Sequence, residues 1–120
     1  MKERSMQQQQ TRVTEDPQAH RFEVFLDDDL AGFIDYKRTA AGLSFLHTEI
    51  DPRFGGRGLG SVLVRGALDA ARAQGLDVLP FCPFVRRYIQ RHPEYLDLVP
   101  ADRRARFELG SEGSGTASPA

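Results

Sequence analysis

A glycine-rich loop between two patterned segments constrains the fold of this chain most strongly. The loop spans residues 51–61 and reads Asp-Pro-Arg-Phe-Gly-Gly-Arg-Gly-Leu-Gly-Ser. It follows an apolar stretch that suits a strand, and it leads directly into apolar residues at helical spacing. Glycine permits positive φ angles and a close approach of the backbone to a ligand. The order of strand, glycine loop and helix therefore predicts a compact α/β domain.

The same loop predicts an anion site. The first turn of the following helix offers unpaired N–H groups and the positive end of the helix dipole, while Arg53 and Arg57 add two cations, which suits a phosphate or pyrophosphate. No Gly-Lys-Ser/Thr follows, which disfavours a P-loop. Leu63 stands where a dinucleotide fingerprint needs a small residue, although Asp77 lies near the distance of its acidic partner. The alternative is a turn that merely connects strand to helix.

Hydrophobic periodicity predicts an antiparallel three-strand meander before the loop and a helix, a parallel strand and a short second helix after it. The expected strands of the meander are residues 21–27, 30–37 and 43–50. The later elements are the first helix, the parallel strand, the second helix and a last short turn, over residues 58–74, 76–81, 83–91 and 94–99.

The length of 120 residues allows one domain at most. Residues 1–18 contain a run of glutamines and few apolar side chains, and residues 110–120 are rich in Gly, Ser, Thr, Ala and Pro. Such segments bury too little apolar surface to order themselves. The composition predicts a disordered N-terminal tail over 1–18, a domain over 19–109 and a disordered C-terminal tail over 110–120.

Charge and cysteine content disfavour several classes of protein. The net charge of −1, without a stripe of basic and aromatic residues, argues against nucleic acid as a partner. No apolar run is long enough to span a membrane and no secretory leader appears, so we expect no membrane partner and a cytoplasmic location. The single cysteine excludes an internal disulfide and suits a reducing compartment. No Cys/His cluster has metal-ligand spacing, and we expect a monomer or weak dimer without metal.

The meander, glycine loop, helix and parallel strand resemble the acetyl-CoA-binding half of the GNAT superfamily of N-acetyltransferases. The GNAT loop motif is Gln/Arg-x-x-Gly-x-Gly/Ala at the start of a helix. Aligned on the helix, Gly58 and Gly60 match the two small positions, and Gly55 departs from the Gln/Arg position. A register two residues earlier, Arg53-x-x-Gly56-x-Gly58, fits the motif literally. We prefer the first register because it better resembles the helix entry of the family.

Three further motifs resemble a small single-domain GNAT subgroup. They are His-Thr-Glu at 47–49, Pro-x-Cys-x-Phe-Val at 80–85 and His-Pro-Glu-Tyr at 92–95. The resemblance covers residues 21–99 and implies transfer of an acetyl group from acetyl-CoA to an unidentified amine. The alternative is a coenzyme A-binding module without significant transfer activity, acting as a sensor or an interaction partner.

The resemblance also implies which residues bind the coenzyme. Backbone N–H groups of the glycine loop would hold the pyrophosphate, with the two loop arginines nearby. The backbone of the strand before the loop would hold the pantetheine arm. The expected coenzyme-binding residues are Thr48, Glu49, Ile50, Arg53, Gly55, Gly56, Arg57, Gly58, Leu59, Gly60, Ser61 and Cys82.

The candidate catalytic residues are His47, Glu49 and Cys82. His47 and Glu49 share one face of a strand, so either could deprotonate an ammonium. Alternatively, His47 is a hydrogen-bonded core residue and Glu49 a partner of Arg53. We expect Cys82 at the end of the parallel strand and partly accessible. It is either a nucleophile that takes the acetyl group, as the subgroup resemblance implies, or a packed residue beside a direct reaction.

Two tyrosines are further candidates. In GNAT enzymes a tyrosine hydroxyl commonly protonates the departing thiolate, and Tyr88 and Tyr95 are equal candidates for this role. The His-Pro pair at 92–93 is interpreted as a helix stop, and it is also placed to shape the acceptor side.

Overall fold

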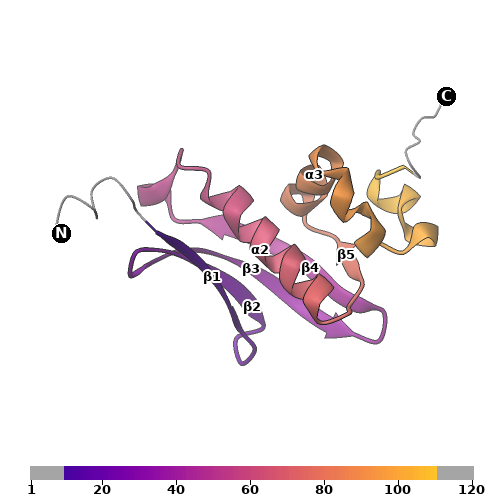
Figure 1. Ribbon diagram of the computed structural model, residues 1–120, viewed down its shortest axis with the longest axis horizontal. Coiled ribbons are helices and arrows are strands. Elements are labelled where there is room, and N and C mark those ends of the chain that lie inside the picture. The colour runs from indigo at the N-terminus through magenta and orange to yellow at the C-terminus, as the bar shows by residue number, and fades with distance from the viewer. Residues whose placement is uncertain (1–9, 111–120) are drawn as a thin grey trace.

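The computed structural model describes residues 10–110 as an α/β domain (Figure 1). A five-stranded sheet has the order β1-β2-β3-β4-β5, in which β1 to β4 are antiparallel and β5 is parallel to β4. The strands are β1 Thr11–Asp16, β2 Arg21–Leu26, β3 Asp29–Thr39, β4 Gly42–Ile50 and β5 Val78–Pro80. The helices are α2 Leu59–Ala73 and α3 Pro83–Arg91, with short 3-10 turns η1 Pro52–Phe54, η2 Pro93–Leu98, η3 Ala101–Arg103 and η4 Ala105–Phe107.

The predicted fold class and order of elements are confirmed. The second helix has the predicted bounds, because Pro83 suits its first turn and His92-Pro93 ends it. The parallel strand is shorter than the expected 76–81. The residues on either side of it form other hydrogen bonds. The Leu76 N–H donates to the Ala71 carbonyl of α2, and the Phe81 N–H donates to the Leu79 carbonyl.

One prediction about the N-terminal segment is wrong. Residues 11–16, expected within a disordered tail, form β1 and pair with β2 from Thr11↔Leu26 to Asp16↔Arg21. A close contact with α2 holds this strand, since a Cβ added at Gly66 would lie 2.8 Å from Val13. Glu15 also accepts a hydrogen bond from the Tyr36 hydroxyl. The rest of both predicted tails, residues 1–9 and 111–120, lies outside the described residues.

The hydrophobic core lies between the sheet and α2, which crosses one face of β1 to β4 (Figure 1). The strands direct alternating side chains onto this face, and α2 buries its apolar stripe against them. The largest fully buried side chains of this layer are Phe22, Phe45, Ile34, Leu43, Leu63 and Leu68.

The helix α3 and the turn η2 pack beside α2. Gly60 in the first turn of α2 makes this approach possible, because a Cβ there would lie 2.6 Å from Cζ of Phe84. Further along α2, Asp69 accepts a hydrogen bond of 2.8 Å from the Tyr95 hydroxyl. No helix within residues 10–110 is long and apolar enough to cross a membrane.

The face of the sheet opposite α2, called the outer face below, carries the polar side chains of β3 and β4. Phe33 lies opposite Glu49, and Asp35 lies opposite His47. The intervening pair, Ile34 and Thr48, points to the α2 side, where Ile34 is fully buried.

Candidate coenzyme-binding site

The glycine loop places two residues in the left-handed conformation before α2. Gly56 has φ 79° and Gly58, the N-cap of α2, has φ 73°. The prediction that Gly58 needs positive φ or close approach is thereby confirmed. A Cβ at either position would meet no described atom within 4 Å. The positive φ angle, and not a lack of space, therefore explains why glycine is found there. Gly55, at φ −64°, has ordinary backbone geometry.

Within the described residues, the first turn of α2 leaves its backbone N–H groups uncapped by side chains, and it contains no acidic residue. Its N–H groups and the positive end of the dipole are therefore available to a negatively charged ligand. Gly60 differs from the other loop glycines, because packing against Phe84 requires it, although its N–H still belongs to this turn.

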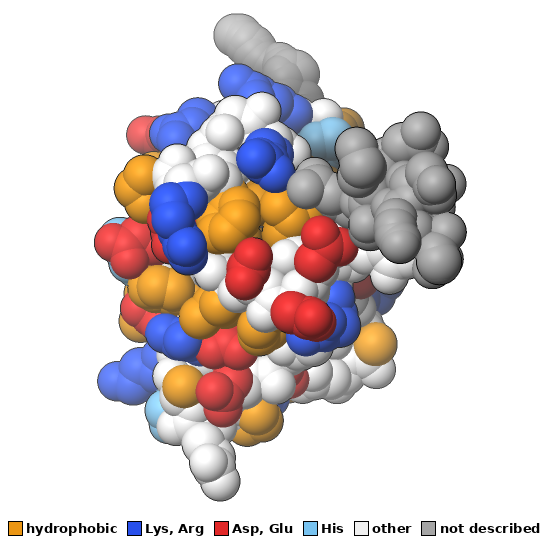
Figure 2. Space-filling model, turned by 90° about the vertical axis from the view of Figure 1, so that its left-hand side faces the viewer, with side chains coloured by type: hydrophobic (Ala, Val, Ile, Leu, Met, Phe, Trp, Pro, Cys, Tyr) orange, Lys and Arg blue, Asp and Glu red, His pale blue; other side chains and the backbone are white. Residues whose placement is uncertain are grey.

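The loop arginines lie next to an aromatic ring and an acidic residue. The Arg53 guanidinium binds the Asp51 carboxylate at 3.0 Å, and this hydrogen bonding lowers the pKa of Asp51 and raises that of Arg53. The alternative pairing of Arg53 with Glu49 is therefore wrong. The guanidinium carbons of Arg53 and Arg57 lie 5.0 and 5.9 Å from the centre of the Phe54 ring. Figure 2 shows basic, acidic and apolar side chains intermixed on this end of the molecule.

The sheet opens between β4 and β5 beyond Phe45. The parallel register ends at Phe45↔Pro80, and the Cys82 N–H donates to the Phe45 carbonyl at 2.9 Å. The next residue, Leu46, forms a β-bulge in β4. It has no partner in β3, because the neighbouring pairs are Tyr36 with Phe45 and Asp35 with His47. Within the described residues, β4 beyond this bulge pairs with β3 alone. The backbone of residues 46–50 therefore offers one edge to a ligand.

The position of Cys82 is confirmed, but its expected accessibility is wrong. It is the N-cap of α3 and follows the parallel strand, as predicted. Only 4% of the residue is exposed. Its sulfur lies 3.2 Å from the Thr48 hydroxyl, and it belongs to the hydrophobic core. Its place in the core, together with the backbone bond to Phe45, accounts for this burial, which sequence periodicity does not reveal.

His47 and Glu49 share the outer face of β4, as predicted. Their Nε2 and Oε2 atoms are 3.7 Å apart, and their side chains are 58% and 63% exposed. The interpretation of His47 as a core histidine is therefore wrong, because the residue lies on the side of the sheet away from α2. Both groups are accessible to an incoming amine.

The two candidate tyrosines are packing residues. Burial, together with the hydrogen bond to Asp69, raises the pKa of Tyr95 to about 12. Burial also raises the pKa of Tyr88, whose ring stacks on His92 with centres 4.1 Å apart. A higher pKa makes each hydroxyl a poorer proton donor at neutral pH. These residues fix η2 and α3 against α2.

The glycine loop at a helix N-terminus, together with a sheet that opens after a β4 bulge, defines an α/β domain suited to an anionic ligand with an extended arm. A sequence model of the GCN5-related N-acetyl-transferase family matches residues 21–98. The chain therefore belongs to this family. Membership indicates an acetyltransferase, and the family typically uses acetyl-CoA. No curated protein sequence matches the chain.

Two contacts at the site were not predicted from the sequence. The Thr48 side chain meets Cys82 only because β4 and α3 come together across the opening. Asp51 caps η1 and accepts the Arg53 N–H, so it shapes the start of the loop. Its position directly before a proline is typical of a turn or cap and was the available signal.

Proposed function

We propose that this protein transfers the acetyl group of acetyl-CoA directly to an amine. The observation that carries the proposal is the end of β4–β5 pairing at Phe45↔Pro80, next to the uncapped N-terminus of α2. A ligand arm placed along β4 would gain backbone hydrogen bonds from residues 48–50. Its phosphates would then reach the N–H groups of residues 56–61, with the loop arginines nearby.

Glu49 is our candidate for the base. An amine is protonated near neutral pH and must lose a proton before it can attack. The Glu49 carboxylate takes this proton, directly or through water, and the nitrogen attacks the thioester carbonyl carbon. The carbon–sulfur bond then breaks, and the second nitrogen proton neutralises the leaving thiolate. The products are an acetylated amine and coenzyme A, and Glu49 later returns its proton to solvent.

We infer that Cys82 supports the site without a covalent step. A nucleophilic thiolate needs access to the thioester and a lowered pKa. Cys82 is 4% exposed and lies against the Thr48 hydroxyl. Its role is to pack the start of α3 against β4, which keeps the opening in place. His47, 3.7 Å from Glu49, is the second candidate for the base.

A coenzyme A-binding module without transfer is the second candidate function. The observation that favours it is the high exposure of His47 and Glu49, since acetyl transfer gains from a site that excludes water.

A matched pair of variants tests the proposal. Glu49 and Glu94 are both exposed carboxylates near a histidine, at 3.7 Å from His47 and 3.9 Å from His92. We expect Glu49→Gln to bind acetyl-CoA like wild type in calorimetry but to lose transfer at neutral pH by about 10²–10⁴-fold, the usual contribution of a general base. Glu94→Gln should keep both. Binding without transfer in wild type would support the module, and absence of binding would contradict both functions.

A further inference from the structure

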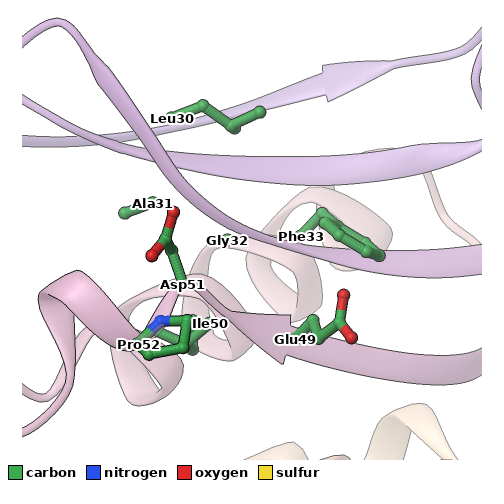
Figure 3. Close-up of a pocket in the computed structure, with 8 residues that line it drawn as sticks. All are labelled: Leu30, Ala31, Gly32, Phe33, Glu49, Ile50, Asp51 and Pro52. Carbon is green, nitrogen blue, oxygen red and sulfur yellow. The ribbon is translucent and has the colours of Figure 1, made fainter.

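A cavity of about 430 Å³ opens beside Glu49 (Figure 3). It lies between the start of β3 and the end of β4, next to η1. The residues that line it are Leu30, Ala31, Gly32, Phe33, Glu49, Ile50, Asp51 and Pro52. The cavity therefore adjoins the candidate base.

Two local features of β3 form the cavity. Ala31 is an extra residue, because Val24 faces Gly32 while Phe25 faces Leu30. The Ala31 carbonyl accepts the Asp51 N–H at 2.8 Å, which ties the end of β4 to the bulge. A Cβ at Gly32 would lie 2.5 Å from the Glu49 carbonyl oxygen, so only glycine permits this approach of β3 to β4. The bulge and the glycine thus set how closely β3 and β4 approach each other beside the cavity.

The lining combines an apolar wall with two carboxylates. Leu30, Phe33, Ile50 and Pro52 supply hydrocarbon and aromatic surface, and Figure 3 shows the Glu49 carboxylate near the Phe33 ring. Among the residues that the structure describes, no lysine or arginine lines the cavity. Apolar walls with a few placed charged groups are typical of sites that select small ligands.

The neighbouring cations are already matched by other carboxylates. Arg53 pairs with Asp51 at 3.0 Å. Arg21 lies 4.6 Å from the centre of the Phe33 ring and pairs with Glu23 at 2.8 Å. Among residues 10–110, Glu49 forms an ion pair with His47. This histidine balances the negative charge of Glu49 only when the imidazole is protonated. A positively charged ligand is therefore the best match for the Glu49 side of the cavity.

We propose that this cavity binds the acceptor as a primary alkylammonium, with the nitrogen at Glu49 and the alkyl chain against Phe33 and Leu30. The inference rests on the proposed function and adds the chemical class of its acceptor. The carboxylate that attracts the ammonium is the same group that removes its proton. A carboxylate at the far end of the chain would be desolvated against apolar walls, so amino acids are disfavoured.

Hexylamine and 6-aminohexanoate test this inference, because they share the ammonium and a similar chain but differ at the far end. Each is titrated into the ¹⁵N-labelled full chain. Hexylamine should shift the amide signals of Gly32, Phe33 and Glu49 and bind more tightly than 6-aminohexanoate. We expect Glu49→Gln and Phe33→Leu each to weaken hexylamine binding by about two- to fivefold, and Glu94→Gln to leave it unchanged. Equal affinities, or shifts confined to other residues, would overturn the inference.

Acetyl-CoA calorimetry and product analysis separate this inference from the proposed function. If acetyl-CoA binds and 6-aminohexanoate is acetylated faster than hexylamine, the assignment of the cavity is wrong and the transferase activity stands. If hexylamine binds at the cavity but acetyl-CoA does not bind, the proposed function is wrong and the cavity remains an alkylammonium site. Acetylated hexylamine as the preferred product, lost in Glu49→Gln, supports both.

Discussion

Replacing Gly60 by alanine should destabilise the domain by crowding the contact between α2 and α3. The new Cβ would lie 2.6 Å from Cζ of Phe84. Because carbon atoms in contact prefer about 3.5–4.0 Å, the ring must retreat by about 1 Å. Overpacking of this kind costs about 1–3 kcal/mol. Alanine recovers at most about 1 kcal/mol through its higher helix propensity.

The middle of the overpacking range, about 2 kcal/mol, less a recovery of at most about 1 kcal/mol, gives an expected net loss of about 1–2 kcal/mol in the free energy of unfolding. For a domain of this size, that corresponds to a fall of about 5–15 °C in Tm. Urea and thermal unfolding followed by circular dichroism measure both quantities. Gly55→Ala is the matched control, because Gly55 has φ −64° and its nearest neighbour to a new Cβ is 3.4 Å away. It should stay within about 0.5 kcal/mol of wild type.

The ring contact can be isolated by a double-mutant cycle. Phe84→Leu removes the atom that the new Cβ would strike, so Gly60→Ala should cost less in that background. We expect a coupling energy of at least about 0.5 kcal/mol. Equal stability of Gly60→Ala and wild type, or additive effects in the cycle, would refute the reasoning.

Three further predictions concern the loop and η2. Gly58→Val forces a β-branched residue to φ 73°, so acetyl-CoA affinity should fall in calorimetry; unchanged affinity would remove Gly58 from the phosphate site. Arg57→Ala should weaken binding by about 1–3 kcal/mol with both acetyl-CoA and its 3′-dephospho form. A loss restricted to the full coenzyme would assign Arg57 to the 3′-phosphate. The pKa of Tyr95 is raised from 10.0 to about 12, so its stabilising contribution is complete below pH 10 and is lost as pH rises towards 12. The gap in urea midpoint between wild type and Tyr95→Phe should shrink over that range, and a constant gap would contradict this role.

The elements with strong local signals were predicted well from the sequence. Alternating apolar residues gave β2 to β4, and a proline at each end gave the bounds of α3. The polar strand β1 was missed because Val13 is its only apolar residue. Its pairing depends on tertiary contacts, chiefly the approach of Val13 to Gly66. A glycine beside the buried stripe of this amphipathic helix was the available signal that another segment packs there.

The candidate site was predicted in outline, but its details come from irregular backbone. The loop glycines and the shared face of His47 and Glu49 follow from local conformation and strand period. The bulges at Ala31 and Leu46 each add one residue to a strand, and simple alternation does not place them. The cavity beside Glu49 depends on the first bulge. The opening of β4 begins at the second, and Thr48 contacts Cys82 beside it.

Mass spectrometry of the protein and the small molecules after incubation with acetyl-CoA and hexylamine tests direct transfer most directly. Wild type should produce N-hexylacetamide and coenzyme A while its own mass stays unchanged. Cys82→Ala should retain most of this activity, because Cys82 is buried and makes no bond to the acetyl group in our account. One added acetyl mass on Cys82, together with loss of product in Cys82→Ala, would contradict direct transfer.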